Sequence, residues 1–179
     1  MPRALLSTTL LAFGLLTTSP ARADSCKWVD GSDKAAPAND PGRGVADWAA
    51  HAAHVNAGAG LTNAHELVSA RMATLKACGD KAAYARVYAD VSVLVGHYGR
   101  SMAGWKDASD PAAPKDDPGR GVASWAAHRD HVLKGAGMDN AHKLVGDRLL
   151  GLSKALPKAA YARLYADASI LLANLARSY

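Results

Sequence analysis

Apolar residues recur at every third or fourth position in long stretches of this chain, which is the spacing of one face of an α-helix. The pattern is clearest over 81–98, where it includes Tyr84, Val87, Tyr88, Val91, Leu94, Val95 and Tyr98. It also predicts a helix over about 45–56, on the stripe Val45, Trp48, Ala52 and Val55. A further helix is expected over about 63–77, on the line Leu61, His65, Val68, Met72 and Leu75. Gly58-Ala59-Gly60 separates these two helices, and Asn63 is a favourable N-cap for the second.

The whole pattern occurs twice. Residues 27–101 align with 104–178 at a constant offset of 77 without a gap, and 43 of the 75 pairs are identical. The third helix of the second copy is expected over 158–177, introduced by Pro157. This period is longer than that of solenoid repeats and indicates a duplicated small domain. Abundant alanine and few aromatic residues favour helices over sheet.

We therefore predict an all-α fold, a tandem duplication of a three-helix unit with six helices in a bundle-like arrangement. The first three-helix repeat is assigned to 24–101 and the second to 102–179; they are called repeat one and repeat two below. Because the connections are short, neighbouring helices are expected to be antiparallel.

Residues 1–23 have the features of a cleaved signal peptide. Arg3 precedes a mostly apolar run, and Ala21-Arg22-Ala23 matches an A-x-A cleavage signature. No later stretch resembles a membrane span. We expect the mature chain to begin near Asp24 and to be a soluble protein of the periplasm or the extracellular medium.

The charge of the chain is mild. Its net charge of +5 falls to +3 without Arg3 and Arg22, counting histidine as neutral. No run of lysine or arginine marks a nucleic-acid surface, so we expect no nucleic-acid partner.

The two cysteines, Cys26 and Cys78, belong to repeat one, and alanine replaces both in repeat two. In an exported protein such a pair predicts one disulfide, which would fix the free start of repeat one. Closing this loop would contribute about 3–4.5 kcal/mol in the chain-entropy description. Free thiols or a metal-binding pair are the alternatives.

Six of the seven histidines lie at equivalent places in the two repeats. They are His51, His54 and His65 in repeat one and His128, His131 and His142 in repeat two. Residues three apart on a helix share nearly one face, and a hairpin would bring the third histidine to the same end. Three converging imidazoles form a His₃ site suited to Zn²⁺, Cu²⁺ or Ni²⁺.

Several arrangements of these histidines stay open. Each repeat can hold its own metal ion, or the two sets can face one another and form a dinuclear centre. Haem held by a histidine pair is a further alternative, but the absence of C-x-x-C-H excludes covalent c-type haem. The histidines can also simply pack against Trp48 and cap helix ends.

Catalysis is the weaker class. Glu66 follows His65 but corresponds to Lys143, and Asp130 corresponds to Ala53, so no carboxylate at short spacing accompanies both histidine sets as a general base. Asp40 or Asp90, which recur in repeat two, could reach the histidines only through folding. No G-x-S-x-G or H-E-x-x-H motif is present.

A helical interaction module is a third class. The pairs Trp28/Trp105 and Trp48/Trp125 would then anchor a protein partner, although large aromatic residues more often fill a small core. The sequence thus predicts an exported metal-binding protein, with a metal-free interaction or adaptor module and a metal-dependent enzyme as its alternatives.

Overall fold

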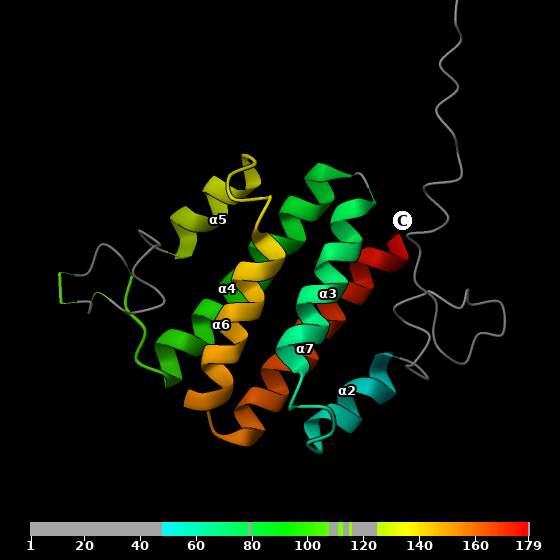
Figure 1. Ribbon diagram of the computed structural model, residues 1–179, viewed down its shortest axis with the longest axis vertical. Coiled ribbons are helices and arrows are strands. Elements are labelled where there is room, and N and C mark those ends of the chain that lie inside the picture. The colour runs from blue at the N-terminus through cyan, green and yellow to red at the C-terminus, as the bar shows by residue number, and fades with distance from the viewer. Residues whose placement is uncertain (1–47, 79, 108–110, 113–114, 116–124, 179) are drawn as a thin grey trace, which may run out of the picture.

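The computed structural model describes residues 48–78, 80–107, 111–112, 115 and 125–178, and every element in them is helical. Figure 1 shows the elements: α2 (Trp48–Asn56), α3 (Ala64–Ala77), α4 (Lys81–Met102), α5 (Trp125–Leu133), α6 (Ala141–Ala155) and α7 (Lys158–Ser178). The all-α prediction is confirmed. None of these helices is both long and apolar enough to cross a membrane. The predicted signal segment, Cys26 and Trp28 lie outside the described residues.

The helix bounds follow local signals in the sequence. Asp80 precedes α4, and its carboxylate accepts a hydrogen bond of 3.0 Å from the backbone N–H of Ala83, as an N-cap residue does. Asn63 occupies the predicted N-cap position of α3, but its side chain makes no capping bond. Gly58 and Gly60 follow α2 with φ of +102° and +67°, a conformation that glycine adopts without strain.

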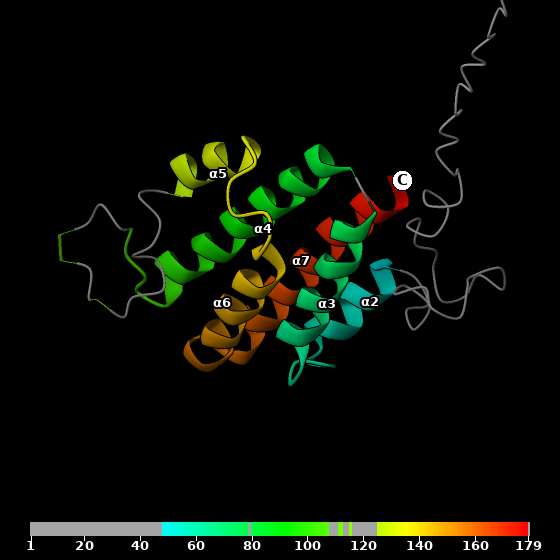
Figure 2. The same cartoon turned by 45° about the horizontal axis from the view of Figure 1, so that its top comes forward.

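The four long helices form a bundle in which each packs mainly on the other repeat. Helix α3 lies against α6 and α7, and α4 lies against the same two helices. The consecutive pairs α3–α4 and α6–α7 are diagonal in the bundle and touch only slightly. Figures 1 and 2 show α3 and α6 side by side, with α4 and α7 crossing behind them.

The short helices extend this exchange between the repeats. Helix α2 packs on α7, and α5 packs on α4, so each covers a helix of the other repeat. Figure 2 shows them at opposite edges of the bundle. Within the described chain, α2 has no packing contact with α3. The expected antiparallel hairpin of α2 and α3 is therefore wrong.

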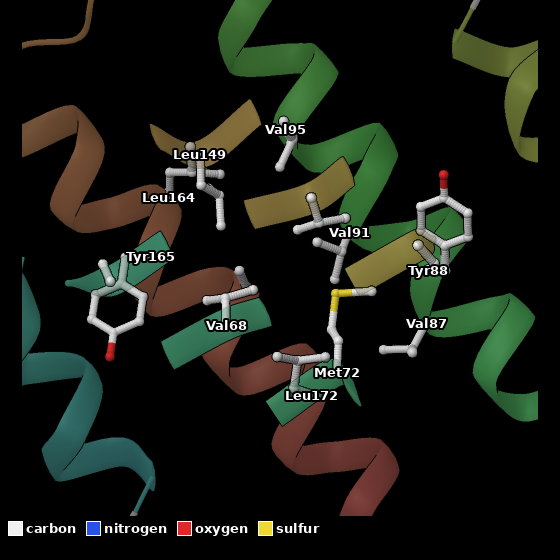
Figure 3. Close-up of a cluster of buried hydrophobic side chains, with 14 of the residues drawn as sticks. Val68, Met72, Val87, Tyr88, Val91, Val95, Leu149, Leu164, Tyr165 and Leu172 are labelled. Carbon is white, nitrogen blue, oxygen red and sulfur yellow. The ribbon is translucent and has the colours of Figure 1, made fainter. Parts of the chain in front are cut away.

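One continuous core results from this interleaving. Buried side chains from all six helices form a single cluster, with Val68 and Met72 from repeat one beside Leu164 and Leu172 from repeat two. Figure 3 shows Tyr88 and Tyr165 at opposite ends of the cluster with their hydroxyls pointing in opposite directions. Neither repeat has a core of its own among the described residues.

Trp105 closes this core beyond the end of α4. Its backbone N–H donates to the Gly99 carbonyl over 2.9 Å, and its side chain is only 7% exposed. The indole lies directly on Gly99, where a β-carbon would collide with the ring. The expectation that this tryptophan fills the core is confirmed.

We expect Gly99→Ala to lower the free energy of unfolding by about 1–3 kcal/mol, because the added methyl must displace the Trp105 indole. Urea titration followed by circular dichroism measures the change. Gly151→Ala is the matched control, since Gly151 lies within α6 with open space around it. Alanine there should stabilise by about 0.5–1 kcal/mol. Equal effects of both substitutions would contradict the packing of Trp105.

Candidate functional site

The six predicted ligand histidines lie at three separate places. His51 and His54 are on α2, and His128 and His131 are on α5 at the opposite edge of the bundle. In each pair the first histidine is half-buried and the second is exposed. His65 and His142 lie in the first turns of α3 and α6 and are half-buried.

The expected convergence of three imidazoles does not occur in the described residues. No group of three or more His, Cys, Asp or Glu side chains in them is placed to hold a metal ion. The reason is the direction that α2 takes. Ala52 and Val55 enter the core shared with α7, and Gly58 lies beside the Lys158 side chain at the start of α7. Burial of this stripe on α7 carries His51 and His54 away from α3.

His51 and His128 instead contact aromatic residues of the opposite repeat. The His51 ring meets Tyr165 edge-on, with ring centroids 6.0 Å apart. The equivalent pair, His128 and Tyr88, is 5.9 Å apart in the same geometry. Because each histidine and its tyrosine come from different repeats, the two contacts are reciprocal and fasten α2 and α5 to the bundle.

An arginine and a serine complete each of these clusters. Buried Arg71 donates from Nη1 to Ser169 Oγ over 3.4 Å, and Ser169 lies one turn beyond Tyr165 on α7. Arg148 and Ser92 hold the equivalent positions beside Tyr88. No sequence motif marks these serines or arginines, although Arg71 and Arg148 stand at equivalent places in the two repeats.

The surroundings of His51 and His128 favour the neutral form of each imidazole. Burial lowers the pKa of His51, and the charges of Arg71 and His54 lower it further. Burial, Arg148 and His131 lower the pKa of His128 in the same way.

We expect this pair of histidines to make the fold sensitive to acid. Unfolded histidine titrates near 6.5, and the folded pKa values lie below that. The unfolded chain therefore binds more protons, so the stabilisation is present above pH 6.5 and is lost as pH falls from 6.5 through the folded pKa values. Thermal melts between about pH 7 and pH 5 should show a steeper fall in Tm for the wild type than for His51→Gln/His128→Gln.

His97 provides the control for these melts. It is exposed on α4, and asparagine already stands at its equivalent, Asn174. His97→Asn should keep the wild-type dependence of Tm on pH. The same slope in the double variant and the wild type would contradict the role given to His51 and His128.

His65 and His142 line one open groove of about 350 Å³ between α3 and α6, together with Glu66 and Asp147. The helices approach closely here, since a β-carbon on Gly146 would lie 3.1 Å from Ser69 Cβ. Ser69 and Gly146 are equivalent positions of the two repeats, so equivalent residues of α3 and α6 meet at this crossing. The structure thus brings together one predicted ligand from each repeat.

A larger cavity, of about 630 Å³, lies where α3 ends and α4 begins, beside the loop between α5 and α6. Its walls combine apolar, backbone and basic groups: Lys76, Lys81, Ala82, Tyr84, Ala85, Leu133, Lys134, Gly135, Gly137, Met138, Asp139 and Asn140. Gly137, with φ of +68°, lies where the loop approaches α4. A β-carbon at Gly137 would be 3.8 Å from Tyr88 Oη, an ordinary contact distance.

No pattern in the sequence predicts this cavity. Three separate segments form it, and most of its residues carry no motif. The available signal was a difference between the repeats: Lys76 and Lys134 of the wall correspond to Ser153 and Ala57. Only the fold shows that these two divergent positions lie on one cavity.

No family model, curated protein or solved structure matches the chain.

Proposed function

We propose that this protein is an exported, non-catalytic binding protein that holds a small organic molecule in the cavity at the α3–α4 corner. The cavity itself carries the proposal. Its volume of about 630 Å³ falls within the range of about 300–1,000 Å³ that is usual for small-molecule sites. Its walls combine apolar side chains with polar ones that can orient a ligand, as such sites do.

A buried aromatic residue forms part of the wall. Tyr84 is 2% exposed, and its hydroxyl is shielded from solvent beside the backbone of His142. Burial raises its pKa to about 12, so the side chain stays uncharged. Tyr84 therefore adds aromatic surface to the cavity and no charge.

Binding fits the cavity better than catalysis does. Its ionisable side chains, apart from buried Tyr84, are Lys76, Lys81, Lys134 and Asp139, and all four are exposed. Solvated rim charges of this kind attract and orient a ligand, whereas general acid–base catalysts are usually tuned by burial or by close charges.

A matched pair of tryptophan substitutions tests the proposal. Ala82 is exposed on the first turn of α4 and lines the cavity, and its equivalent Ala159 is exposed on α7. The neutral fluorescent probe N-phenyl-1-naphthylamine should bind the wild type and Ala159→Trp alike. Ala82→Trp should reduce its affinity at least about ten-fold, because the indole fills the cavity. Unchanged binding by Ala82→Trp would place the probe elsewhere and contradict the proposal.

Export and the disulfide belong to the same proposal. A bridge between Cys78 and Cys26 would fix the chain that leads to α2 against the end of α3. We expect mass spectrometry of the exported protein without reductant to give a chain starting near Asp24 with a mass two hydrogens below that of the dithiol form. Alkylation of both thiols without prior reduction would contradict the bridge.

Transition-metal binding is the second candidate, favoured by the placement of His65 and His142, one predicted ligand from each repeat, on one groove. Water would complete the coordination of an ion held by the two imidazoles, because no third His, Cys, Asp or Glu of the described residues is placed to bind it. Calorimetric titration with Zn²⁺ or Cu²⁺ tests it. His65→Ala/His142→Ala should abolish binding, while His97→Ala should preserve it. Equal affinity and stoichiometry in these two variants would exclude the groove as the metal site.

A further inference from the structure

Building on the proposed cavity function, we propose that the ligand is an organic anion. It carries one carboxylate, sulfonate or phosphate group on an apolar body. The charged group lies at the rim with Lys81 and Lys134, and the body lies between Leu133, Met138 and Tyr84. The inference rests on the proposed function, and it adds the charge and shape of the molecule that the cavity accepts.

The rim of the cavity has an excess of positive charge. Lys76, Lys81 and Lys134 face a single carboxylate among its lining residues, that of Asp139. Lys76 already engages this residue, donating from Nζ to the Asp139 carbonyl over 3.0 Å and lying 3.4 Å from its carboxylate. Lys81 and Lys134 make no ion pair within the described part of the chain. Two cations at one cavity are thus available to a ligand.

The backbone near Lys81 adds to the positive charge at the rim of the cavity. Lys81 is the first residue of α4, a helix of 22 residues whose N-terminal end carries a partial positive charge. The Asp80 carboxylate, which caps this helix, opposes part of that charge. The two lysines therefore supply most of the attraction, and the helix end supplies a smaller part.

Apolar side chains border the same opening. Leu133 is 41% exposed at the end of α5, and Met138 from the following loop packs partly against the core. Ala85 and Tyr84 line the cavity from α4. An exposed leucine beside two lysines suits a ligand with an apolar body and a charged end, because the body covers the leucine while the charge stays near solvent.

The equivalent place in the other half of the molecule lacks these features. Lys134 corresponds to Ala57, Leu133 to Asn56 and Lys76 to Ser153. The remaining cation, Lys158, lies across Gly58, with Cε 3.3 Å from the position of a β-carbon there. Two repeats that are identical at most positions have thus diverged in charge and apolarity where one of them borders a cavity.

A pair of probes with one body and different charge tests the inference on the full mature chain. They are 1-anilinonaphthalene-8-sulfonate and its uncharged counterpart N-phenyl-1-naphthylamine. We expect the sulfonate to bind at least about five-fold more tightly than the neutral probe, as two exposed cations contribute modestly. Raising NaCl from about 0.05 to 0.5 M should weaken the binding of the sulfonate and leave that of the neutral probe unchanged, because salt screens exposed charges.

Substitution of the lysines locates the charged end. Lys81→Gln/Lys134→Gln should reduce the affinity for the sulfonate at least about five-fold and leave that for the neutral probe unchanged. Lys158→Gln, the control in the other half, should bind both probes as the wild type does. Circular dichroism melts verify that each variant keeps its fold, and Ala82→Trp shows which part of each signal comes from the cavity. Inorganic phosphate, an anion without a body, should compete only at concentrations at least about 100-fold higher than the sulfonate.

The outcomes separate the two proposals. Equal binding of both probes in the cavity, unchanged by Lys81→Gln/Lys134→Gln, would overturn the organic anion and leave a small-molecule site. An equal loss of sulfonate affinity in Lys158→Gln would also overturn the organic anion, since the affinity would then depend on the total charge of the protein. If phosphate competed as strongly as the sulfonate, the inference that the cavity binds an apolar body would be overturned. Binding of both probes that Ala82→Trp does not affect would overturn the cavity function and the anion together.

Discussion

A chain shortened to its first repeat, residues 24–101, will not fold as a monomer. The apolar faces of α3 and α4 pack on α6 and α7, and α2 packs on α7, so the shortened chain lacks the partners of all three helices. Helices α3 and α4 touch each other too little to form a core. We expect the loss of the entire folding free energy, which is about 5–15 kcal/mol for a typical domain.

Far-UV circular dichroism and sedimentation velocity on a dilution series measure this effect. Helix should be absent at low concentration and should appear only with a species of twice the mass, in which a second copy supplies the positions of repeat two. The full mature chain is the control, and its helix content should not change on dilution. A helical monomer that is independent of concentration would contradict the interleaved fold.

Leu149→Ala will destabilise the whole chain by about 2–5 kcal/mol. Leu149 is fully buried in α6 among side chains of both repeats (Figure 3), and truncation leaves a cavity that the close-packed core fills only in part. Because α6 packs on α3 and α4, the loss is shared across the repeats. Urea unfolding gives the free energy, and hydrogen exchange should show equal loss of protection in α3 and α6.

Leu150 supplies the control for this measurement. It is the next residue of the same helix and is 36% exposed, so Leu150→Ala should cost less than about 1 kcal/mol. A loss of protection confined to α6 and α7 in Leu149→Ala would indicate two independent cores, contrary to the structure.

The helices could be predicted from the sequence because their signals are local. The apolar spacing over 81–98 gave α4, and the glycines at 58 and 60 gave the end of α2. The packing partners could not be predicted in the same way. The repeats are so similar that a helix face which fits its own repeat also fits the other. The choice between packing within a repeat and packing between repeats depends on the loop after α2 and on the total apolar surface that each arrangement buries. No local sequence pattern reports either of these.

The candidate site likewise combines features that are predictable from local sequence with features that depend on packing. Sequence spacing places His51 and His54 on one helix, as observed, but the packing of α2 turns only His51 towards Tyr165. The cluster with Arg71 and the cavity beside Lys134 each combine segments that are distant in the chain. Such sites depend on the pairing of helices, so they could be identified only after the fold was known.

The stoichiometry of ligand binding tests the central claim most directly, namely that two interleaved repeats build one ligand cavity. Calorimetric titration of the full mature chain with 1-anilinonaphthalene-8-sulfonate gives this number. The asymmetry between the Lys134 side of the molecule and the Ala57 side predicts one molecule per chain, lost in Ala82→Trp and kept in Ala159→Trp. Two equal sites per chain, or one site that persists in Ala82→Trp, would contradict it.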